Sequence, residues 1–141
     1  MPKGVAVMLH GEVAKRVKCV EQVSDRILAV KISAMPVDMR IVQMYMPTTD
    51  HEDEEVEEMY DKIEKIMDKE KGCSNVIIMG DFNASVGEGN DENGNKVIGK
   101  YGLGKRNDRG QMVVDFCIKR QLTVTNTWFQ QIKKTIYVKK A

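Results

Sequence analysis

Residues 76–84 constrain the fold of this 141-residue chain more than any other segment. Four apolar residues suited to a buried strand are followed by Gly-Asp-Phe-Asn and then alanine. Residues i and i+2 of an extended segment point to the same side, so Asp81 and Asn83 are predicted to converge where the strand ends. Open α/β sheets place their ligand sites at such strand ends. The sequence therefore predicts a functional site at this position.

Apolar and β-branched residues predict further strands in the first third of the chain. Two of these stretches flank Met35-Pro36-Val37-Asp38 and are predicted to pair as a hairpin. Pro47 ends the second of them, because proline cannot donate to a strand ladder. The predicted strands are Gly4–His10, Val17–Val23, Arg26–Ser33 and Met39–Met46.

The rest of the chain alternates helical and extended patterns. Apolar residues at helical spacing predict a helix over Glu52–Lys71, with Asp50 as its N-cap and Gly72 after its end. A second helix is predicted to begin with a capping box formed by Asp108 and Gln111. Strands are predicted over Asn75–Met79, Leu122–Thr125 and Ile136–Val138, and a glycine-rich loop over Gly87–Asn107. Strands around two amphipathic helices predict an α/β (α+β) layered fold.

The formal net charge of +1 conceals two segments of opposite charge. Residues 50–71 hold eleven acidic and four basic residues, whereas residues 96–120 hold seven basic and two acidic residues. A basic segment that follows the Gly-Asp-Phe-Asn sequence favours an anionic ligand such as a phosphodiester. The alternative is an ordinary solvated surface. The candidate substrate-binding residues are Lys105, Arg106 and Arg109 of this segment, together with Asn126.

Asp81 and Asn83 have side chains suited to phosphoryl chemistry. Such a site needs a group that deprotonates or orients water, and donors that stabilise charge on the phosphorus oxygens. Asp81 is a candidate base or metal ligand, and Asn83 is a candidate donor. Tyr45 and Asn126 also end predicted strands, so their side chains are candidates for the same rim. In the alternative interpretation, the aspartate and asparagines are turn residues and the tyrosine is a packed aromatic.

The three cysteines, Cys19, Cys73 and Cys117, show no metal-ligand spacing. Their odd number, without a secretory pattern, predicts reduced thiols and an intracellular location, nuclear or cytoplasmic. Cys117 falls in an apolar helical pattern and is predicted to be a core residue. No apolar run is long enough to cross a membrane, and the sequence lacks the P-loop and dinucleotide-binding glycine motifs.

Several segments together resemble the endonuclease/exonuclease/phosphatase superfamily. Its hallmark is Gly-Asp-Phe-Asn, found here at residues 80–83 and preceded by Tyr-Met-Pro-Thr at 45–48. The sequences GKYGLG at 99–104, RNDRGQ at 106–111 and DFC at 115–117 are similar to the endonuclease domains of LINE-class non-LTR retrotransposons. The resemblance runs from about residue 4 to residue 131.

The resemblance implies a magnesium-dependent phosphodiesterase built on two packed β-sheets covered by helices. It also implies a nucleic-acid substrate, attacked by an activated water with inversion at phosphorus. By matching position, Asp81 would activate the water or handle the leaving group, and would bind the metal. Asn83 would stabilise charge, and Tyr45 would contact the phosphate.

The family's metal-binding glutamate and catalytic histidine match no position of this sequence. We therefore expect residues 1–141 to form a single, truncated domain with a partial two-sheet sandwich, in which Mg²⁺ binds weakly or not at all. The alternative to an endonuclease is a catalytically inactive, retrotransposon-derived remnant that binds nucleic acid or protein. DNA is the expected partner, and unpaired sheet edges predict self-association.

Overall fold

A computed structural model describes residues 4–89 and 96–130. They belong to two compact units, which divide between Asn83 and Ala84. The strand predicted over Ile136–Val138 lies outside the described residues. Within the described residues, no helix has both the length and the apolar character needed to span a bilayer.

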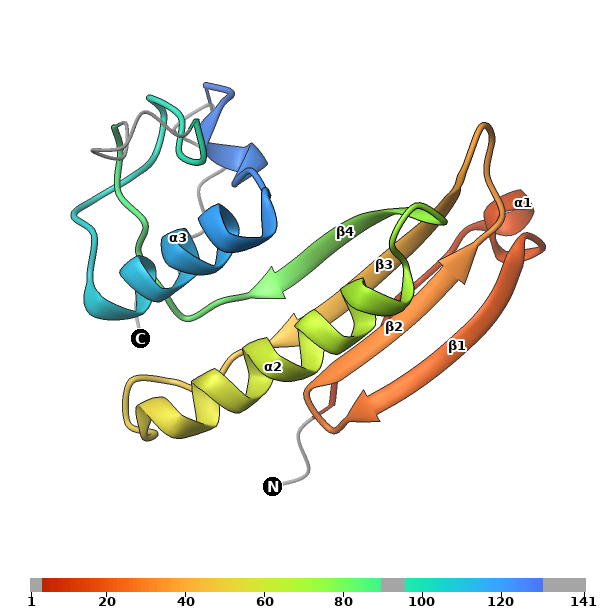
Figure 1. The fold of residues 1–141 in the computed structure, drawn as a ribbon, viewed down its shortest axis with the longest axis horizontal. Helices are drawn as coiled ribbons and strands as arrows, with labels where there is room; N and C mark the ends of the chain where they lie inside the picture. The colour runs from red at the N-terminus through yellow and green to blue at the C-terminus, as the bar shows by residue number, and fades with distance from the viewer. Residues whose placement is uncertain (1–3, 90–95, 131–141) are drawn as a thin grey trace. The chain divides into compact units, whose positions relative to one another are not determined.

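The first unit contains a four-stranded sheet crossed by one long helix (Figure 1). Its first three strands are antiparallel neighbours, and the fourth returns parallel to the third after the helix. The predicted mixed α/β class and the predicted hairpin are confirmed. The elements of the first unit are α1 (Gly11–Ala14), β1 (Val17–Ser24), β2 (Ile27–Ile32), β3 (Asp38–Tyr45), α2 (Asp53–Lys69) and β4 (Ser74–Asp81), and those of the second unit are α3 (Asp108–Arg120) and the 3₁₀ helix η1 (Thr125–Thr127).

Residues 4–10 do not form the strand that their pattern predicted. Val5, Val7 and Leu9 are partly buried and the residues between them are exposed, so the expected alternation is present. A strand also needs a hydrogen-bonded neighbour, and these residues are not part of the described sheet. Alternating burial here reflects one-sided packing without a ladder.

Helix α2 covers one face of the sheet with the apolar stripe that the sequence predicted (Figure 1). Ile63 of the helix is fully buried, as are Ile27 and Met44, which are register partners on β2 and β3. Lys31 lies on the same side of β2 as Ile27, because alternate residues share a face. It reaches Glu70 at the end of α2, with 3.0 Å between Nζ and Oε2, which identifies this face as the helix-facing one.

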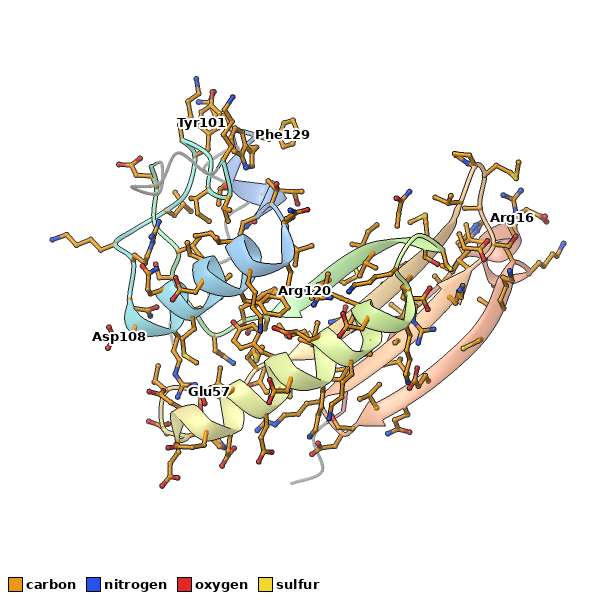
Figure 2. The ribbon with its side chains drawn as sticks, viewed as in Figure 1. Arg16, Glu57, Tyr101, Asp108, Arg120 and Phe129 are labelled. Atoms are coloured by element: carbon orange, nitrogen blue, oxygen red, sulfur yellow. The ribbon has the colours of Figure 1, made fainter. Side chains whose placement is uncertain are left out.

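The ends of α2 differ from the prediction. Its N-cap is Glu52, not Asp50, and the Glu52 side chain makes no capping hydrogen bond. Acidic residues near this end complement the helix dipole, and exposed ones such as Glu57 project from the helix (Figure 2). The C-cap is Glu70, and Gly72 lies two residues further on, with φ of +72°. The glycine therefore forms the turn into β4 and does not cap the helix.

The two edge strands of the described sheet differ in their protection. Strand β1 has two register shifts and an exposed Lys18, features that discourage pairing with another chain. Strand β4 pairs without a register shift and leaves Ile77 and Met79 41% and 44% exposed. Self-association through unpaired edges stays a prediction.

Helix α3 is the longest element of the described part of the second unit. Its N-cap is Asn107, whose side-chain oxygen accepts a hydrogen bond from the Gly110 N–H at 2.8 Å. The capping box predicted for Asp108 and Gln111 is therefore wrong: the helix starts one residue earlier, and Gly110 at its third position has no side chain to complete a box. The helix itself, with its buried apolar stripe, is confirmed.

The strand predicted over Leu122–Thr125 is wrong. The Leu122 N–H donates to the Cys117 carbonyl at 2.8 Å, so these residues complete the end of α3. Val124 then makes an isolated parallel bridge with Ile98, and η1 follows. Of the residues predicted to form this strand, only Val124 has a β-bridge partner among the described residues.

Candidate functional site

A glycine allows β4 to approach β3 closely just before the strand ends. Gly80 has φ of +137°, a conformation that side chains disfavour. A Cβ atom at this position would lie 1.8 Å from the Met44 carbonyl oxygen. Any other residue would therefore push the two strands apart, and only glycine permits the pairing of the residues that follow.

The next pair in this ladder is Tyr45 with Asp81. The ladder closes one residue later, where the Met46 N–H donates to the Asp81 carbonyl at 2.9 Å. Neighbouring strands lie about 4.8 Å apart and paired residues share a face. Tyr45 and Asp81 therefore lie side by side at the carboxyl ends of two parallel strands, with their side chains on one face. Both lie on the face opposite to α2, because Met44 lies on the helix-facing side.

Asn83 remains beside Asp81, but by a different route from the predicted extended segment. It has φ of +46°, so the chain turns after the strand. Its N–H donates to Oδ1 of Asp81 at 2.9 Å, and its Nδ2 donates to the Met46 carbonyl at 2.7 Å. The first contact is the turn capping that the alternative interpretation required of the aspartate. The second ties the end of β4 to β3, so Asn83 fixes the site's backbone.

Arg26 also lies at this edge, although the sequence interpretation did not include it. Its carbonyl accepts the Tyr45 N–H at 3.0 Å, and its Nη1 donates to the Tyr45 carbonyl at 3.3 Å. The guanidinium carbon lies 5.5 Å from the centre of the tyrosine ring. The predicted hairpin could have identified Arg26, because pairing its two strands brings Arg26, the first residue of one strand, opposite the end of the second strand.

The remaining candidate residues belong to the second unit. Asn126 in η1 and Lys105 are exposed. Arg106 donates from Nε to the Val86 carbonyl at 2.9 Å and from Nη1 to Oε1 of Gln111 at 3.1 Å, so its guanidinium holds the loop. Arg109 is buried, with 8% of its surface exposed. The first unit thus brings Tyr45, Asp81 and Asn83 together, and the other four candidates are positioned within the second unit.

Asp81 is the described residue that best fits a magnesium ligand at the β3–β4 edge. Its carboxylate is exposed, and one oxygen accepts the N–H of Asn83 while the other has acceptor capacity left. Mg²⁺ is often held by one or two carboxylates together with substrate phosphate and water. Among residues 4–89 and 96–130, no three His, Cys, Asp or Glu side chains gather into a metal-binding group. Asp81 therefore fits as a single protein ligand.

Cys117 has the role in the core that its apolar pattern predicted. It is buried in α3, and burial raises the pKa of its thiol to about 11. A thiol with such a high pKa is protonated near neutral pH, and the thiolate is the nucleophilic form. Cys117 is therefore a packing residue.

Comparisons with known proteins add to this geometry. The family model described as "Endonuclease-reverse transcriptase" matches residues 39–136. Craniofacial development protein 2 of Bos taurus is 29% identical over 134 residues, which cover 95% of this chain and 22% of that protein. The protein of the same name from Tragulus javanicus is 28% identical over 134 residues, covering 95% and 23%. The chain thus spans about a fifth of the length of these relatives.

Proposed function

We propose that this chain acts as a nucleic-acid phosphodiesterase. The chain belongs to the endonuclease-reverse transcriptase family and is endonuclease/exonuclease/phosphatase-like, as its sequence predicted. The observation that carries the proposal is the pairing of Tyr45 with Asp81 at the carboxyl ends of two parallel strands. A phenol and a carboxylate at one strand edge supply a donor for a phosphate oxygen and an acceptor for a water proton.

In this mechanism Asp81 orients the attacking water. The Asn83 N–H donates to one carboxylate oxygen, and the other oxygen, which has no partner among the described residues, accepts the proton of the water. The water oxygen forms a bond to phosphorus as the bond to the leaving oxygen breaks, with inversion. The Tyr45 hydroxyl donates to a phosphate oxygen, where negative charge develops.

Asn83 stabilises the position of Asp81 through the backbone. Because its Nδ2 bonds the Met46 carbonyl, the turn that carries the Asp81 carboxylate is anchored to the neighbouring strand. Asp81 is also the residue that would hold Mg²⁺. A bound Mg²⁺ would neutralise charge on the phosphate and polarise it.

A nicking assay on supercoiled plasmid, with Mg²⁺ and with EDTA, tests the proposal. We expect magnesium-dependent nicking by the unmodified chain. Asp81→Ala is expected to reduce the rate by about 10²–10⁴-fold, the typical contribution of an acid or base group. Asn83→Ala should also lower the rate, because it releases the turn. The matched control is Asp61→Ala, which removes an exposed carboxylate from α2 and is expected to nick normally.

Two results would contradict the proposal. One is nicking that persists unchanged in folded Asp81→Ala protein. The other is salt-sensitive DNA binding without any nicking, which would favour the alternative of a catalytically inactive, nucleic-acid-binding remnant. Circular dichroism of each variant separates loss of activity from loss of fold.

A further inference from the structure

Three neighbouring strands place three different polar groups in one row. Arg26 precedes β2 and pairs through its backbone with Tyr45, which pairs in turn with Asp81 on β4. Strand spacing of about 4.8 Å makes the whole row about 10 Å wide. Arg26, Tyr45 and Asp81 are therefore neighbours at the carboxyl end of β3, on the face away from α2.

Most of the Arg26 guanidinium has no hydrogen-bond partner among the described residues. A guanidinium has five N–H donors, and the hydrogen bond from Nη1 to the Tyr45 carbonyl uses one of them. No described residue accepts a hydrogen bond from Nε or Nη2, and no described carboxylate forms an ion pair with Arg26. The side chain is partly exposed, so a ligand can reach the remaining donors.

The guanidinium is also held in place. The ring of Tyr45 lies beneath it and the Tyr45 carbonyl accepts its Nη1, so two contacts orient the remaining donors beside the phenol. A planar guanidinium with several free donors matches the oxygens of a phosphate group better than other side chains do. Orientation before binding reduces the entropy lost when the anion arrives.

We infer that Arg26 is an anion-binding residue that takes a phosphate group of the substrate beside Tyr45. This inference rests on the proposed function, since it assigns a residue to the same site. The phosphate is bound by Arg26 on one side of the phenol, while Asp81 on the other side faces the water. The row thus separates the group that holds the anion from the group that accepts the proton.

An NMR titration with inorganic phosphate tests the inference without any need for cleavage. We expect phosphate to shift the Arg26 Nε–H resonance and the Tyr45 amide in a saturable manner. Arg26→Ala should abolish the response of the Tyr45 amide, and Arg26→Lys should weaken it, because lysine keeps the charge but loses the planar fork. The control, Arg16→Ala, removes an exposed arginine that adjoins β1 (Figure 2) and should leave the response intact.

Fluorescence anisotropy with a short DNA duplex extends the test to the substrate class. We expect Arg26→Ala to bind about tenfold more weakly, the effect of one charge-assisted contact, and to reduce the salt dependence by about one phosphate contact. Equal behaviour of Arg26→Ala and Arg16→Ala in both titrations would overturn the inference, even if the plasmid is nicked. A chain that fails to nick DNA but shows the Arg26-dependent phosphate shift would defeat the proposed function and retain the anion site.

Discussion

The two ends of the four-stranded sheet each hold an arginine, in opposite circumstances. Arg40 lies near the start of β3 and is 3% exposed, whereas Arg26 lies beside the end of β3 and is partly exposed. Arg40 lies near Glu70 at the end of α2, and Arg26 lies at the same end of the sheet as Asp81 of β4. The difference between them lies in how many of their donors are already used.

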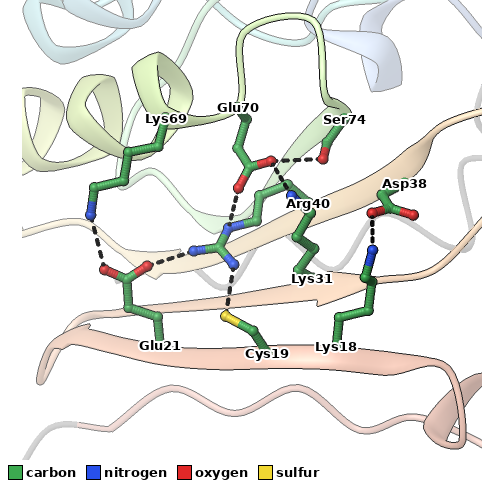
Figure 3. Close-up of polar contacts among 9 residues, drawn as sticks. All are labelled: Lys18, Cys19, Glu21, Lys31, Asp38, Arg40, Lys69, Glu70 and Ser74. Atoms are coloured by element: carbon green, nitrogen blue, oxygen red, sulfur yellow. Dashed lines mark hydrogen bonds and ion pairs between the residues drawn. The ribbon is translucent and has the colours of Figure 1, made fainter.

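At the first end the charges form a closed network (Figure 3). Nη2 of Arg40 lies 2.6 Å from Oε2 of Glu21, and its Nη1 donates to Sγ of Cys19 at 3.5 Å. Its Nε lies 3.6 Å from Oε1 of Glu70, which is close enough for an ion pair but too far for a hydrogen bond. Glu70 also accepts hydrogen bonds from Lys31 at 3.0 Å and Ser74 at 2.7 Å.

At the second end the groups are open. Arg26 uses one donor on the Tyr45 carbonyl, and the Asp81 carboxylate accepts only the nearby Asn83 N–H among its described contacts. Charge by itself therefore does not identify a site. The network around Arg40 joins α2 to the strands and pairs most of its members, although Nε of Arg40 makes no hydrogen bond. Unfilled donors and acceptors at a strand end are instead available to a ligand.

The largest expected effect is on stability, at the closed end. Arg40→Ala leaves Glu70 and Glu21 without their buried partner, and breaking a buried pair costs about 3–5 kcal/mol. Urea unfolding followed by circular dichroism measures this loss. Arg26→Ala, with a partly exposed side chain, is expected to cost less than about 1 kcal/mol. Equal losses for the two variants would break the distinction between the ends.

The next effect is a pH dependence that arises from Glu70. Burial alone would raise the pKa of this carboxyl, but the hydrogen bonds from Ser74 and Lys31 outweigh burial, so the pKa is lowered from its ordinary value of 4.5. Because the folded pKa is below the unfolded one, this stabilisation is complete above about pH 4.5 and is lost as the pH falls through the folded pKa.

Glu70→Gln is expected to cost about 1–3 kcal/mol near neutral pH, since a charged hydrogen-bond acceptor is lost. It should also flatten the decline in stability below pH 4.5. The decline should not vanish, because the hydrogen bond from Lys18 lowers the pKa of Asp38 as well. Urea midpoints across the acid range measure both effects, and Glu58→Gln on the exposed side of α2 is the control. An unchanged acid slope in Glu70→Gln would show that another carboxyl dominates.

The smallest stability effect is expected at the open end. Tyr45→Phe keeps the ring beneath Arg26 and removes a hydroxyl with no hydrogen bond among the described residues, so stability should change by less than about 0.5 kcal/mol. The nicking rate should nevertheless fall about tenfold, the worth of one hydrogen bond to a charged oxygen. A stability loss as large as that of Arg40→Ala would mean that Tyr45 is a structural residue.

Much of this fold was predictable from local patterns. The helical stripe of α2, the β2–β3 hairpin and the strand that ends at Asp81 all follow from residue periods and turn signals. The helix caps were harder, because Asn107 competes with its neighbour Asp108 and their patterns differ by one residue. The strand predicted over Leu122–Thr125 failed because extended residues also need a partner, and no local pattern specifies one.

That a carboxylate and a carboxamide follow an apolar strand can be read from the sequence, because apolar runs, glycine and polar side chains are local features. What surrounds them depends on tertiary contacts. The β3–β4 register places Tyr45 beside Asp81, a left-handed backbone directs the Asn83 side chain to Met46, and hairpin pairing brings Arg26 over the tyrosine ring. These contacts join residues that are far apart along the chain, so their positions depend on strand register and not on spacing in the sequence.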